Sequence, residues 1–340
     1  MDLHQIRKQI DNIDDSILEL FAKRFDLCKE ISSYKEKNNL SLKDNNRELE
    51  IIKERTTKFS ELGHNEPEFV EDIFTLILDK SRQKIRYCQH KEGEPKIISI
   101  IGGRGKMGSL FAEEFRKRGH TVLVSNEEKT NSIELAQKGN LVIVTVPIHK
   151  VGEVLKEVIP HLKEDALLTD FTSIKEEPLE IMKNSGSSFV GGHPLFGQVK
   201  SLDDKNFILT PGRGSFSWYQ ELLQSIGLNV IVMPAQEHDK AMAVVQCLTH
   251  FSNMAFANLL KKMEIKENIS TPAYKSRLKK IKRMFSQDAS LISEIQFRNK
   301  FSEKMAADYL QSVTELQQIV SSGSKDKFES LFNEAKEALK

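Results

Sequence analysis

Residues 96–119 read KIISIIGGRGKMGSLFAEEFRKRG, and this stretch predicts a strand, a glycine-rich turn and a helix in that order. The turn carries Gly103-x-Gly105-x-x-Gly108, in which the glycines permit a tight turn, close approach of a pyrophosphate and close helix packing. The pyrophosphate would lie at the N-terminus of the helix. A purely structural turn is the alternative. We predict a dinucleotide site at this turn, made by Gly103, Arg104, Gly105, Lys106, Met107 and Gly108.

The second predicted strand, TVLVSN at residues 121–126, bears on which dinucleotide binds. An acidic residue at its end would accept hydrogen bonds from the ribose hydroxyls of NAD. That position holds Ser125 or Asn126, and Glu127 follows. No arginine follows closely to neutralise the 2′-phosphate of NADP, although Lys129 could do so. The sequence therefore favours NAD, with Asn126 and Glu127 near the ribose.

Alternating β-branched runs and helical segments extend from Lys96 to about residue 234. The runs are KIISII, TVLVSN, LVIVTVP, ALLTDF and SFVGG, with FILTPG and LNVIVMP as two further candidates. Such alternation predicts parallel strands joined by crossover helices, as in a Rossmann-like fold. From Ala235 the apolar spacing becomes three and four residues, which predicts helices. We therefore expect an α/β dinucleotide-binding domain at 96–234 and an all-α domain at 235–340.

The first 90 residues differ in composition, since they contain a single glycine and, apart from Pro67, no proline. Apolar residues spaced by three and four predict a helix over about 3–38, followed by helices over 44–58 and from Pro67 onward. We expect an all-α domain at 1–90 and a linker at 91–95. The first helix is too long for a lone small domain, so we predict that it pairs with a second copy of the chain.

Length and composition limit the class of protein. The chain has 340 residues, 39% of them hydrophobic and 29% charged, which fits two or three folded domains. Lys and Arg number 50 against 49 Asp and Glu, so the net charge of +1 provides no overall field for nucleic acid or an acidic membrane. The N-terminus is too charged for a signal peptide, and no apolar run approaches about 20 residues. Cys28, Cys88 and Cys247 fit neither a metal pair spacing nor a disulfide set, so we expect a cytoplasmic protein without a metal site.

The N-terminal helix carries cations on its predicted buried seam. Arg24 occupies a position where an apolar residue is expected, and Lys35 lies about 20° around the helix and about 16 Å further along. Arg7 is about 25 Å from Arg24 on the same helix, so it can join their cleft only from a second chain. Arg47 and Glu48 could close over the same space, and such a cluster suits a small dianion. The alternative is a seam arginine that snorkels or pairs with a carboxylate.

Residues 1–90 resemble the helical class of chorismate mutases through IRKQIDNID, LFAKRFDL, SSYK, DNNRELE and LDKS, found in this order. Their reaction is a pericyclic rearrangement that needs only a folded substrate and positive charge at the ether oxygen. The resemblance departs at Ile85, where the family usually has Gln or Glu, so Gln83 or Lys84 would have to donate to that oxygen instead. The resemblance assigns Arg7 of the partner subunit, Arg24 and Arg47 to the two carboxylates, Lys35 to the ether oxygen, Glu48 to the ring hydroxyl, and Asp44 and Ser81 to the pocket lining.

The segment GGHPLFG at 191–197 follows the strand-like run SFV, which places His193 at a carboxyl end of the sheet, where ligands bind in open α/β folds. A histidine in a loop there predicts an acid-base group, and an ordinary surface histidine is the alternative. His238, Gln246 and His250 recur at spacings of eight and four, so they share a helical face. They are secondary candidates for substrate binding, and satisfied core residues are the alternative.

Residues 96–310 resemble prephenate dehydrogenases through GGRGKMG, VIVTVPIH, TDFTSIK, GGHPLFG, EHDKAMAVVQCLTHF and KRMFSQD. The resemblance implies that His193 accepts the ring hydroxyl proton while hydride passes to NAD+ and carbon dioxide is lost. It also implies that the C-terminal helical domain serves substrate binding and dimerisation. Further residues that it assigns are Arg283 to the substrate carboxylate, Ser173 and His149 to the surroundings of nicotinamide and substrate, and Val146 and Pro147 to the cofactor. By themselves, Arg283 could belong to a solvated basic helix face and His149 could merely cap a helix.

Joined in this order, the two halves resemble the bifunctional enzymes that combine chorismate mutase with NAD-dependent prephenate dehydrogenase in tyrosine biosynthesis. We therefore expect a cytoplasmic homodimer that acts on chorismate and prephenate and has neither nucleic acid nor a membrane as a partner. One alternative is an arogenate dehydrogenase whose mutase domain is structural. Another is a non-catalytic cofactor-sensing protein, which would not need His193, Ser173 and Arg283 together.

Overall fold

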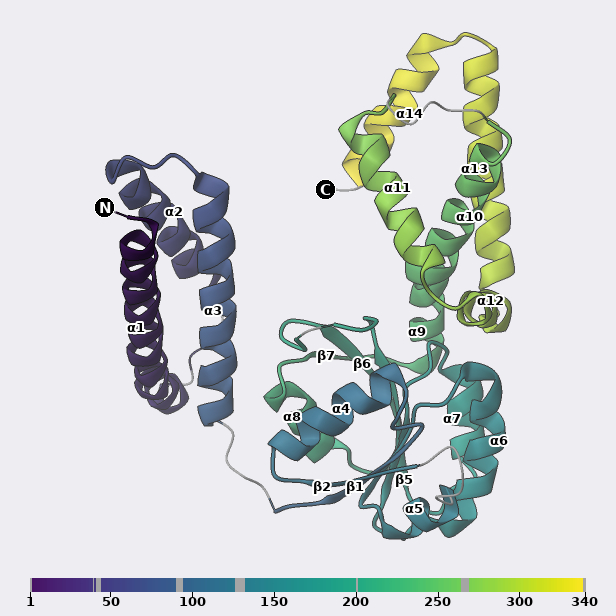
Figure 1. Cartoon of the computed structure of the whole chain (residues 1–340). Helices are drawn as coiled ribbons and strands as arrows, with labels where there is room; N and C mark the ends of the chain where they lie inside the picture. The colour runs from purple at the N-terminus through teal and green to yellow at the C-terminus, as the bar shows by residue number, and fades with distance from the viewer. Residues whose placement is uncertain are drawn as a thin grey trace.

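The computed structural model describes residues 2–38, 40, 44–89, 94–125, 132–199, 201–263 and 269–338. Three helices come first, a seven-stranded sheet with helices on both faces follows, and a second group of helices ends the chain (Figure 1). This order confirms the predicted fold class. The elements of each kind lie within 1–90, 96–234 and 235–340, and part of the predicted linker at 91–95 lies outside the described residues.

The N-terminal part consists of α1 (Leu3–Lys37), α2 (Asn45–Glu61) and α3 (Pro67–Gln89). Asp2 begins α1 with a capping box, and the Asp44 side chain caps α2 by accepting a backbone N–H of its first turn. Helix α3 packs against both α1 and α2. These bounds agree with the helices that the apolar spacing predicts.

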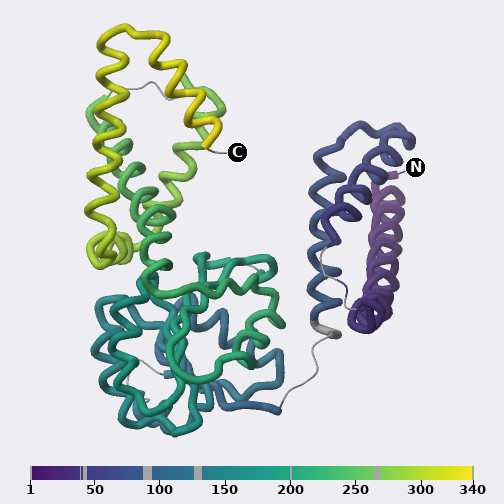
Figure 2. The backbone as a smooth tube through the Cα atoms, turned by 180° about the vertical axis from the view of Figure 1, so that it is seen from behind, coloured from purple at the N-terminus to yellow at the C-terminus, as the bar shows by residue number. Residues whose placement is uncertain are grey.

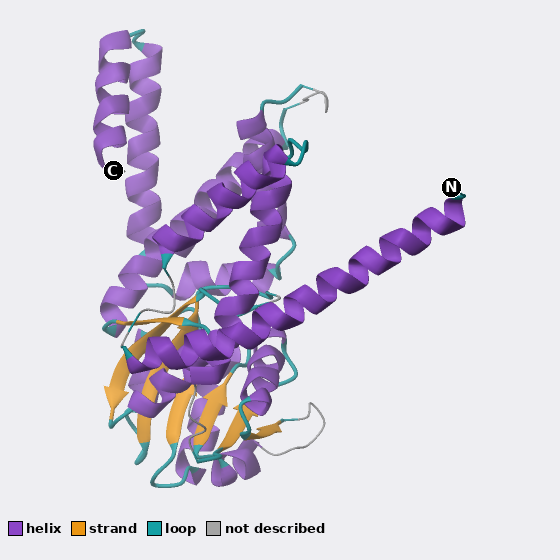
Figure 3. Ribbon diagram, turned by 90° about the vertical axis from the view of Figure 1, so that its left-hand side faces the viewer, coloured by secondary structure: helices purple, strands orange, loops and turns teal. Residues whose placement is uncertain are grey.

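The first half of α1 exposes its apolar stripe. Leu3, Ile13 and Leu20 are 62%, 59% and 63% exposed. Figure 3 shows this end of the helix extending away from the rest of the chain. The buried residues of α1, Cys28 and Ser32, come later in the helix. Burying apolar surface gains about 25 cal/mol per Å², so a long exposed stripe is the pattern expected of a surface that another chain covers.

The seven strands lie in the order β2-β1-β3-β4-β5-β6-β7. Strands β1 to β5, formed by the first five predicted runs, are parallel as predicted, whereas β6 follows β5 directly in the element order and returns antiparallel to it. The chain order reverses beside β1, because β2 and β3 flank it, and the carboxyl ends there form the usual ligand crevice. All seven predicted runs form strands: β1 (Ile97–Ile101), β2 (Thr121–Val124), β3 (Leu141–Val144), β4 (Leu167–Asp170), β5 (Ser188–Pro194), β6 (Asn206–Arg213) and β7 (Asn229–Val232).

Helices cover both faces of the sheet (Figure 1). One core cluster contains Phe111 and Phe115 of α4 together with Tyr219 of α8, and the cluster on the other face contains Leu155 of α6 and Met182 of α7. Because both faces are covered, the central strands are apolar without alternation. The helices of this part are α4 (Lys106–Lys117), α5 (Ser132–Lys138), α6 (Ile148–Val158), α7 (Glu176–Met182) and α8 (Ser217–Ser225), with a short 3-10 turn at Ile159–His161.

A continuous helical rod leads from the sheet into the C-terminal part (Figure 2). It contains α9 (Ala235–Met242), a π-helical segment (Ala243–Leu248) and α10 (Thr249–Leu260). Among the described helices, none combines the length and the apolar character that a membrane span requires. The remaining helices are α11 (Pro272–Phe285), α12 (Ala289–Arg298), α13 (Ser302–Ser321) and α14 (Lys325–Ala338).

Candidate active sites

The glycine-rich turn joins β1 to α4 at the carboxyl edge of the sheet. The backbone N–H of Gly103 donates to the carbonyl of Ile100 at 3.2 Å, and that of Gly105 donates to Gly102 at 2.9 Å. A Cβ added to Gly108 would lie 2.6 Å from the Gly102 carbonyl oxygen, so only glycine allows the helix to start this close to the turn. Gly105 begins α4 without a side-chain cap, which leaves the first N–H groups of the helix for a pyrophosphate.

Gly102 and Ser125 complete this turn. Gly102 has a left-handed backbone, with φ at +84°, and a Cβ there would lie 2.9 Å from Thr145. Its N–H donates to Ser125 Oγ at 2.9 Å, so Ser125 supports the turn. The three-glycine pattern gives no role to Gly102, although the doubled glycine of the motif could have indicated it. Asn126 and Glu127, which we predict beside the ribose, lie outside the described residues.

The other predicted cofactor residues lie along the same edge. Arg104 and Lys106 are exposed at the start of α4, and Met107 is half buried there. Val146 and Pro147 follow β3, which pairs with β1. The residues present therefore fit a dinucleotide lying across the ends of β1 and β3.

His193 is the penultimate residue of β5 and is 2% exposed. The sequence predicts a loop at this position, but the strand continues through His193 because it pairs with β6. Its Nδ1 lies 2.8 Å from His238 Nε2, and its Nε2 lies 3.5 Å from Gln246 Nε2. Burial, assisted by His238 and Lys175, holds the pKa of His193 well below its ordinary value. The imidazole is therefore neutral at physiological pH.

His238 and Asp239 of α9 form a buried chain of hydrogen bonds behind His193. His238 Nδ1 lies 2.7 Å from Asp239 Oδ1. The Asp239 carboxylate also accepts backbone N–H groups from Lys175 at 2.8 Å and from Glu176 at 3.0 Å. The sequence makes His238 a secondary candidate but does not indicate Asp239, because these backbone partners are 64 and 63 residues away in the chain.

A buried ion pair supports the end of β5. Lys175 Nζ pairs with Asp170 of β4 and donates to the carbonyl of Gly192 at 2.7 Å, and both charged side chains are fully buried. Burial lowers the pKa of Lys175, and the Asp170 carboxylate opposes that shift. Removing one partner of a buried pair costs roughly 3–5 kcal/mol. The pair therefore holds the backbone beside His193, although sequence reasoning missed it within TDFTSIK.

The remaining candidates of the dehydrogenase site differ in their surroundings. Ser173 is half buried in the loop after β4, the strand beside β5. His149 is exposed in the first turn of α6. His250 is half buried and lines an apolar cavity of about 370 Å³, and burial lowers its pKa. Arg283 is exposed near the end of α11, so a single chain leaves this guanidinium facing solvent.

The later half of α1 packs on α3 at the predicted mutase site. Arg24 donates a hydrogen bond to Ser81 Oγ between the two helices. Lys35 is half buried further along α1, and the Asp44 side chain is engaged as the cap of α2. Arg7 is exposed on the uncovered end of α1. One chain therefore leaves Arg7 remote from Arg24, as the helix geometry predicts.

Two residues of the predicted mutase site have partners that the sequence does not indicate. Glu48 forms an ion pair with Arg82, which is 7% exposed. Arg47 is exposed and pairs with Glu50 on its own helix instead of turning toward Arg24. Burial lowers the pKa of Arg82, but Glu48 and neighbouring carboxylates outweigh that effect, so the pKa is raised and the guanidinium stays charged.

The position that departs from the mutase pattern is buried. Ile85 is 6% exposed, and its carbonyl accepts a hydrogen bond from Ser32 Oγ at 3.0 Å. Gln83 donates to Ser201 of the sheet-containing part at 2.7 Å, and Lys84 is exposed. The Gln83 side chain is therefore engaged by another part of the chain, and donation by Gln83 or Lys84 to the ether oxygen stays a prediction.

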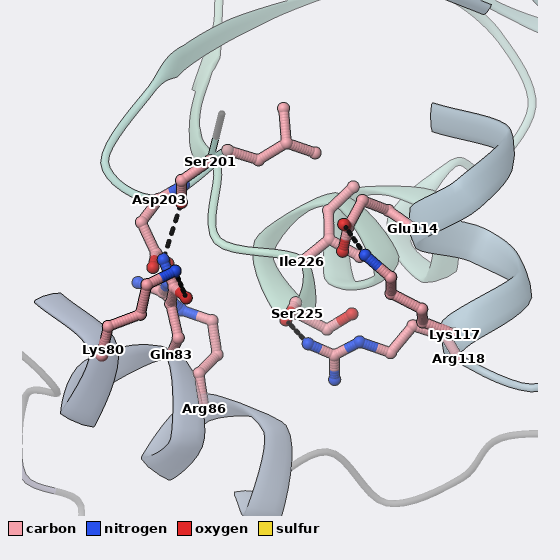
Figure 4. Close-up of a pocket in the computed structure, with 11 residues that line it drawn as sticks. Lys80, Gln83, Arg86, Glu114, Lys117, Arg118, Ser201, Asp203, Ser225 and Ile226 are labelled. Carbon is pink, nitrogen blue, oxygen red and sulfur yellow. Dashed lines mark hydrogen bonds and ion pairs between the residues drawn. The ribbon is translucent and has the colours of Figure 1, made fainter. Parts of the chain in front are cut away.

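The last turns of α3 contact the sheet-containing part. Arg86 pairs with Asp203, and Arg82 Nη2 lies 3.3 Å from Asp204 Oδ2. Burial raises the pKa of Asp203, and the Arg86 charge opposes that rise. Figure 4 shows Arg86 and Asp203 on one side of a pocket of about 420 Å³ between α3 and α4. Arg82 thus contacts both Glu48 of the predicted mutase site and a loop of the sheet-containing part.

Comparison with protein families agrees with two sites in one chain. Residues 6–85 match the family described as chorismate mutase type II. Residues 111–232 match the nucleotide-binding domain of prephenate dehydrogenase, and residues 234–334 match its dimerization domain. The fold and its sites thus define a fusion of a helical mutase with a dinucleotide-dependent dehydrogenase.

Individual relatives cover almost the whole chain. It is 30% identical to the T-protein of Enterobacter agglomerans over 343 residues, which cover 98% of this chain and 91% of that relative. It is 31% identical to the T-protein of Haemophilus influenzae over 304 residues, covering 86% of this chain and 80% of the relative. The fold matches the crystal structure of prephenate dehydrogenase from A. aeolicus in complex with hydroxyphenyl propionate and NAD+, with a TM-score of 0.62, 22% identity, and coverage of 72% and 98%. The chain belongs to the T-protein family, and it combines chorismate mutase with prephenate dehydrogenase in tyrosine synthesis.

Proposed function

We propose that the dehydrogenase half oxidises prephenate with NAD+ and that His193 is the base for the ring hydroxyl. The observation that supports this role most is the state of His193, which is buried, held at Nδ1 and kept neutral by a lowered pKa. A neutral imidazole with one nitrogen engaged can accept a proton at the other. NAD+, when bound at the ends of β1 and β3, supplies the hydride acceptor.

In this reaction the side chains of the protein accept one proton and hold the substrate in place. The ring carbon that carries the hydroxyl loses hydride, and the hydroxyl proton passes to His193 Nε2. The carboxylate on the opposite ring carbon leaves as carbon dioxide, and its bonding electrons make the ring aromatic, so the oxygen ends as a phenol once it is reprotonated. Arg283 binds a substrate carboxylate, and Ser173 and His149 line the space near the reacting carbon. Alignment supplies most of the catalysis, because formation of an aromatic ring already drives the reaction.

The preference for NAD over NADP rests on the segment after β2. Residues 125–130 read SNEEKT, with two glutamates, one lysine and no arginine. Glutamates near the ribose accept hydrogen bonds from its hydroxyls and repel a 2′-phosphate.

For the mutase half we propose that Arg24 and Arg7 of the partner subunit bind the two carboxylates of chorismate, with Lys35 at the ether oxygen. Glu48 accepts a hydrogen bond from the ring hydroxyl. Its carboxylate therefore has to bind the substrate while it also pairs with Arg82. These cations stabilise negative charge that grows on the ether oxygen in the transition state. Arg47, Asp44 and Ser81 complete the pocket.

We propose a cytoplasmic homodimer. The exposed stripe of α1 and the matched dimerization domain support pairing of two chains. Cys28 and Cys247 are free and buried, which agrees with a reducing compartment.

The test is a stepwise assay of the purified protein. With chorismate alone, chorismate should be consumed without any cofactor. Addition of NAD+ should then produce NADH, and NADP+ or arogenate should give slower reactions. Faster oxidation of arogenate than of prephenate would contradict the proposed substrate, and unchanged chorismate would contradict the proposed mutase site.

A further inference from the structure

We propose that Asp239 and His238 are positioning residues of the dehydrogenase reaction, because together they decide which ring nitrogen of His193 carries the proton. The inference rests on the proposed role of His193 as the base. It follows from the order of donors and acceptors along the buried chain Asp239, His238, His193, whose two links are 2.7 Å and 2.8 Å long.

Asp239 sets the direction of this chain. Its Oδ1 accepts the N–H of Lys175, and its Oδ2 accepts the N–H of Glu176, both at the start of α7. Each backbone N–H can only donate, so the carboxylate is held as an acceptor. The residue is 4% exposed, which leaves little solvent to compete. His238 Nδ1, at 2.7 Å, must therefore donate to Asp239.

The next link follows from the neutrality of His238. Burial lowers its pKa, although the hydrogen bond to Asp239 opposes that shift. A neutral histidine with its proton on Nδ1 has a lone pair on Nε2. His193 Nδ1 lies 2.8 Å from that lone pair and must be the donor. The lone pair of His193 is therefore on Nε2.

Among the described residues, that lone pair has only a weak protein partner, which the substrate hydroxyl would replace. His193 Nε2 lies 3.5 Å from Gln246 Nε2. A hydrogen bond of that length is weak, so a substrate hydroxyl can replace it. Gln246 lies in the π-helical segment after α9, and such segments often occur at functional sites. The opposite tautomer would present an N–H to the hydroxyl, and that ring could not accept its proton.

The charged groups around His193 also fit this role. The Asp239 carboxylate stabilises the imidazolium that forms when His193 takes a proton, through the intervening His238 ring. Lys175 acts in the other direction and, together with burial, keeps His193 neutral before the reaction. These surroundings keep His193 unprotonated before the reaction. They also place the Asp239 carboxylate where it stabilises the imidazolium that forms during the reaction.

The same three residues connect two parts of the molecule. His193 lies on β5 of the sheet, whereas His238 and Asp239 lie on α9, the first helix of the C-terminal part. The backbone carbonyl of Asp239 also accepts a hydrogen bond from Asn299 Nδ2 at 2.7 Å. The protonation state of the base therefore depends on how the C-terminal helices sit on the sheet.

Kinetics of matched variants test the proposal. Asp239→Asn preserves size but offers an N–H toward His238, so it should lower dehydrogenase kcat by roughly 10²- to 10³-fold with little change in prephenate KM. His238→Gln keeps an acceptor for the His193 Nδ1–H and should lose much less activity than His238→Leu, which has none. Mutase activity of the same samples reports whether each chain is folded, and Asp165→Asn in an exposed loop is the matched control.

The ¹⁵N shifts of labelled histidine rings provide a readout that a purely structural role would not move, with His193→Asn used to assign the signal. We expect wild-type His193 to carry its proton on Nδ1, and Asp239→Asn and His238→Leu to shift it toward Nε2. A wild-type proton on Nε2, or normal kcat in both Asp239→Asn and His238→Leu, would overturn the positioning role. If Asp239→Asn does not fold, the comparison of His238→Gln with His238→Leu decides alone, and equal loss in the two would count against the proposal. Normal dehydrogenase activity of His193→Asn would instead overturn the proposed base.

Discussion

The proposed base of the dehydrogenase site and the proposed cations of the mutase site lie in opposite surroundings. His193 is 2% exposed and is held by a chain of buried partners within one polypeptide. In the mutase site, Arg47 is exposed, and Arg7 lies on a stretch of α1 whose apolar stripe is uncovered in a single chain. A single chain thus positions His193 completely, whereas it leaves the proposed mutase site without Arg7.

The two chemistries explain this difference. A base must be neutral before the reaction and charged after it, so its pKa has to be adjusted by burial and by placed charges. Arginine and lysine keep their charge without such adjustment, and the mutase reaction asks them only to be near the ether oxygen and the carboxylates. A site of permanent cations can therefore be completed by a second chain, whereas a tuned imidazole needs its surroundings preformed.

The largest expected effect separates the two sites at His193. His193→Asn should lower dehydrogenase turnover by roughly 10²- to 10⁴-fold, the usual range for a positioned acid-base group. NAD+ binding and mutase activity should stay normal, because the substitution lies in neither of those sites. Dehydrogenase turnover, cofactor titration and chorismate consumption on one preparation measure all three. Near-normal turnover would show that another group, with His149 next in line, is the base.

A second large effect should show that the mutase site is shared. Arg7→Ala and Arg24→Ala should each lower mutase activity at least about 30-fold, because losing a buried charge partner costs roughly 2–5 kcal/mol. After subunit exchange, an equal mixture should recover about a quarter of wild-type activity, since half the dimers carry one intact site. Lys23→Ala, an exposed cation beside Arg24, is the matched control. Exchange shown by labelled subunits without recovered activity would contradict sharing.

Replacing Arg283 tests whether this arginine binds the substrate carboxylate, although its side chain is exposed in a single chain. Arg283→Ala should raise the KM for prephenate about 10- to 100-fold, because a hydrogen bond to a charged group is worth about 1.5–3 kcal/mol. Turnover should change little, since carboxylate binding is similar in the ground and transition states. Steady-state kinetics beside Lys282→Ala, the neighbouring exposed cation, measure the effect. An unchanged KM would remove Arg283 from the site.

The smallest expected effect concerns Ile85, where the mutase pattern lacks a donor. Ile85→Gln should raise mutase turnover, by up to about tenfold, if its amide reaches the ether oxygen. Ile85→Met has similar volume without a donor and controls for packing at this buried position. Equal turnover in the two variants would show that the missing donor does not limit the reaction.

The sequence predicts most of the fold, because its determining signals are local. The β1 turn is encoded within residues 96–119, and the apolar spacing of α1 is visible over its full length. For His193 the sequence predicts a loop, because a Gly-Gly-His-Pro segment shows no β-branched alternation; only pairing with β6 extends the strand through it. The antiparallel return of β6 likewise depends on its tertiary pairing.

The site is predicted less completely, because its supporting residues come from distant segments. Motifs indicate His193 directly, but Asp239 acquires its role through contacts with α7 across 64 residues. Arg82 likewise looks like one cation in a basic stretch until α2 brings Glu48 to it, 34 residues away. A residue that acts through a side chain far away in the sequence belongs to no local motif or periodic pattern. Only the folded structure therefore reveals it.

The pH dependence of both activities on one wild-type preparation tests the contrast between the sites most directly. Burial puts the pKa of His193 below its ordinary value of 6.5, so the ring is neutral near neutral pH and protonates only as the pH falls through that lowered pKa. Dehydrogenase kcat/KM should therefore be level near neutrality and fall on the acid side. Mutase activity should not follow this fall, because its cations stay charged. An acid limb shared by both activities, or a dehydrogenase that has none, would contradict the account.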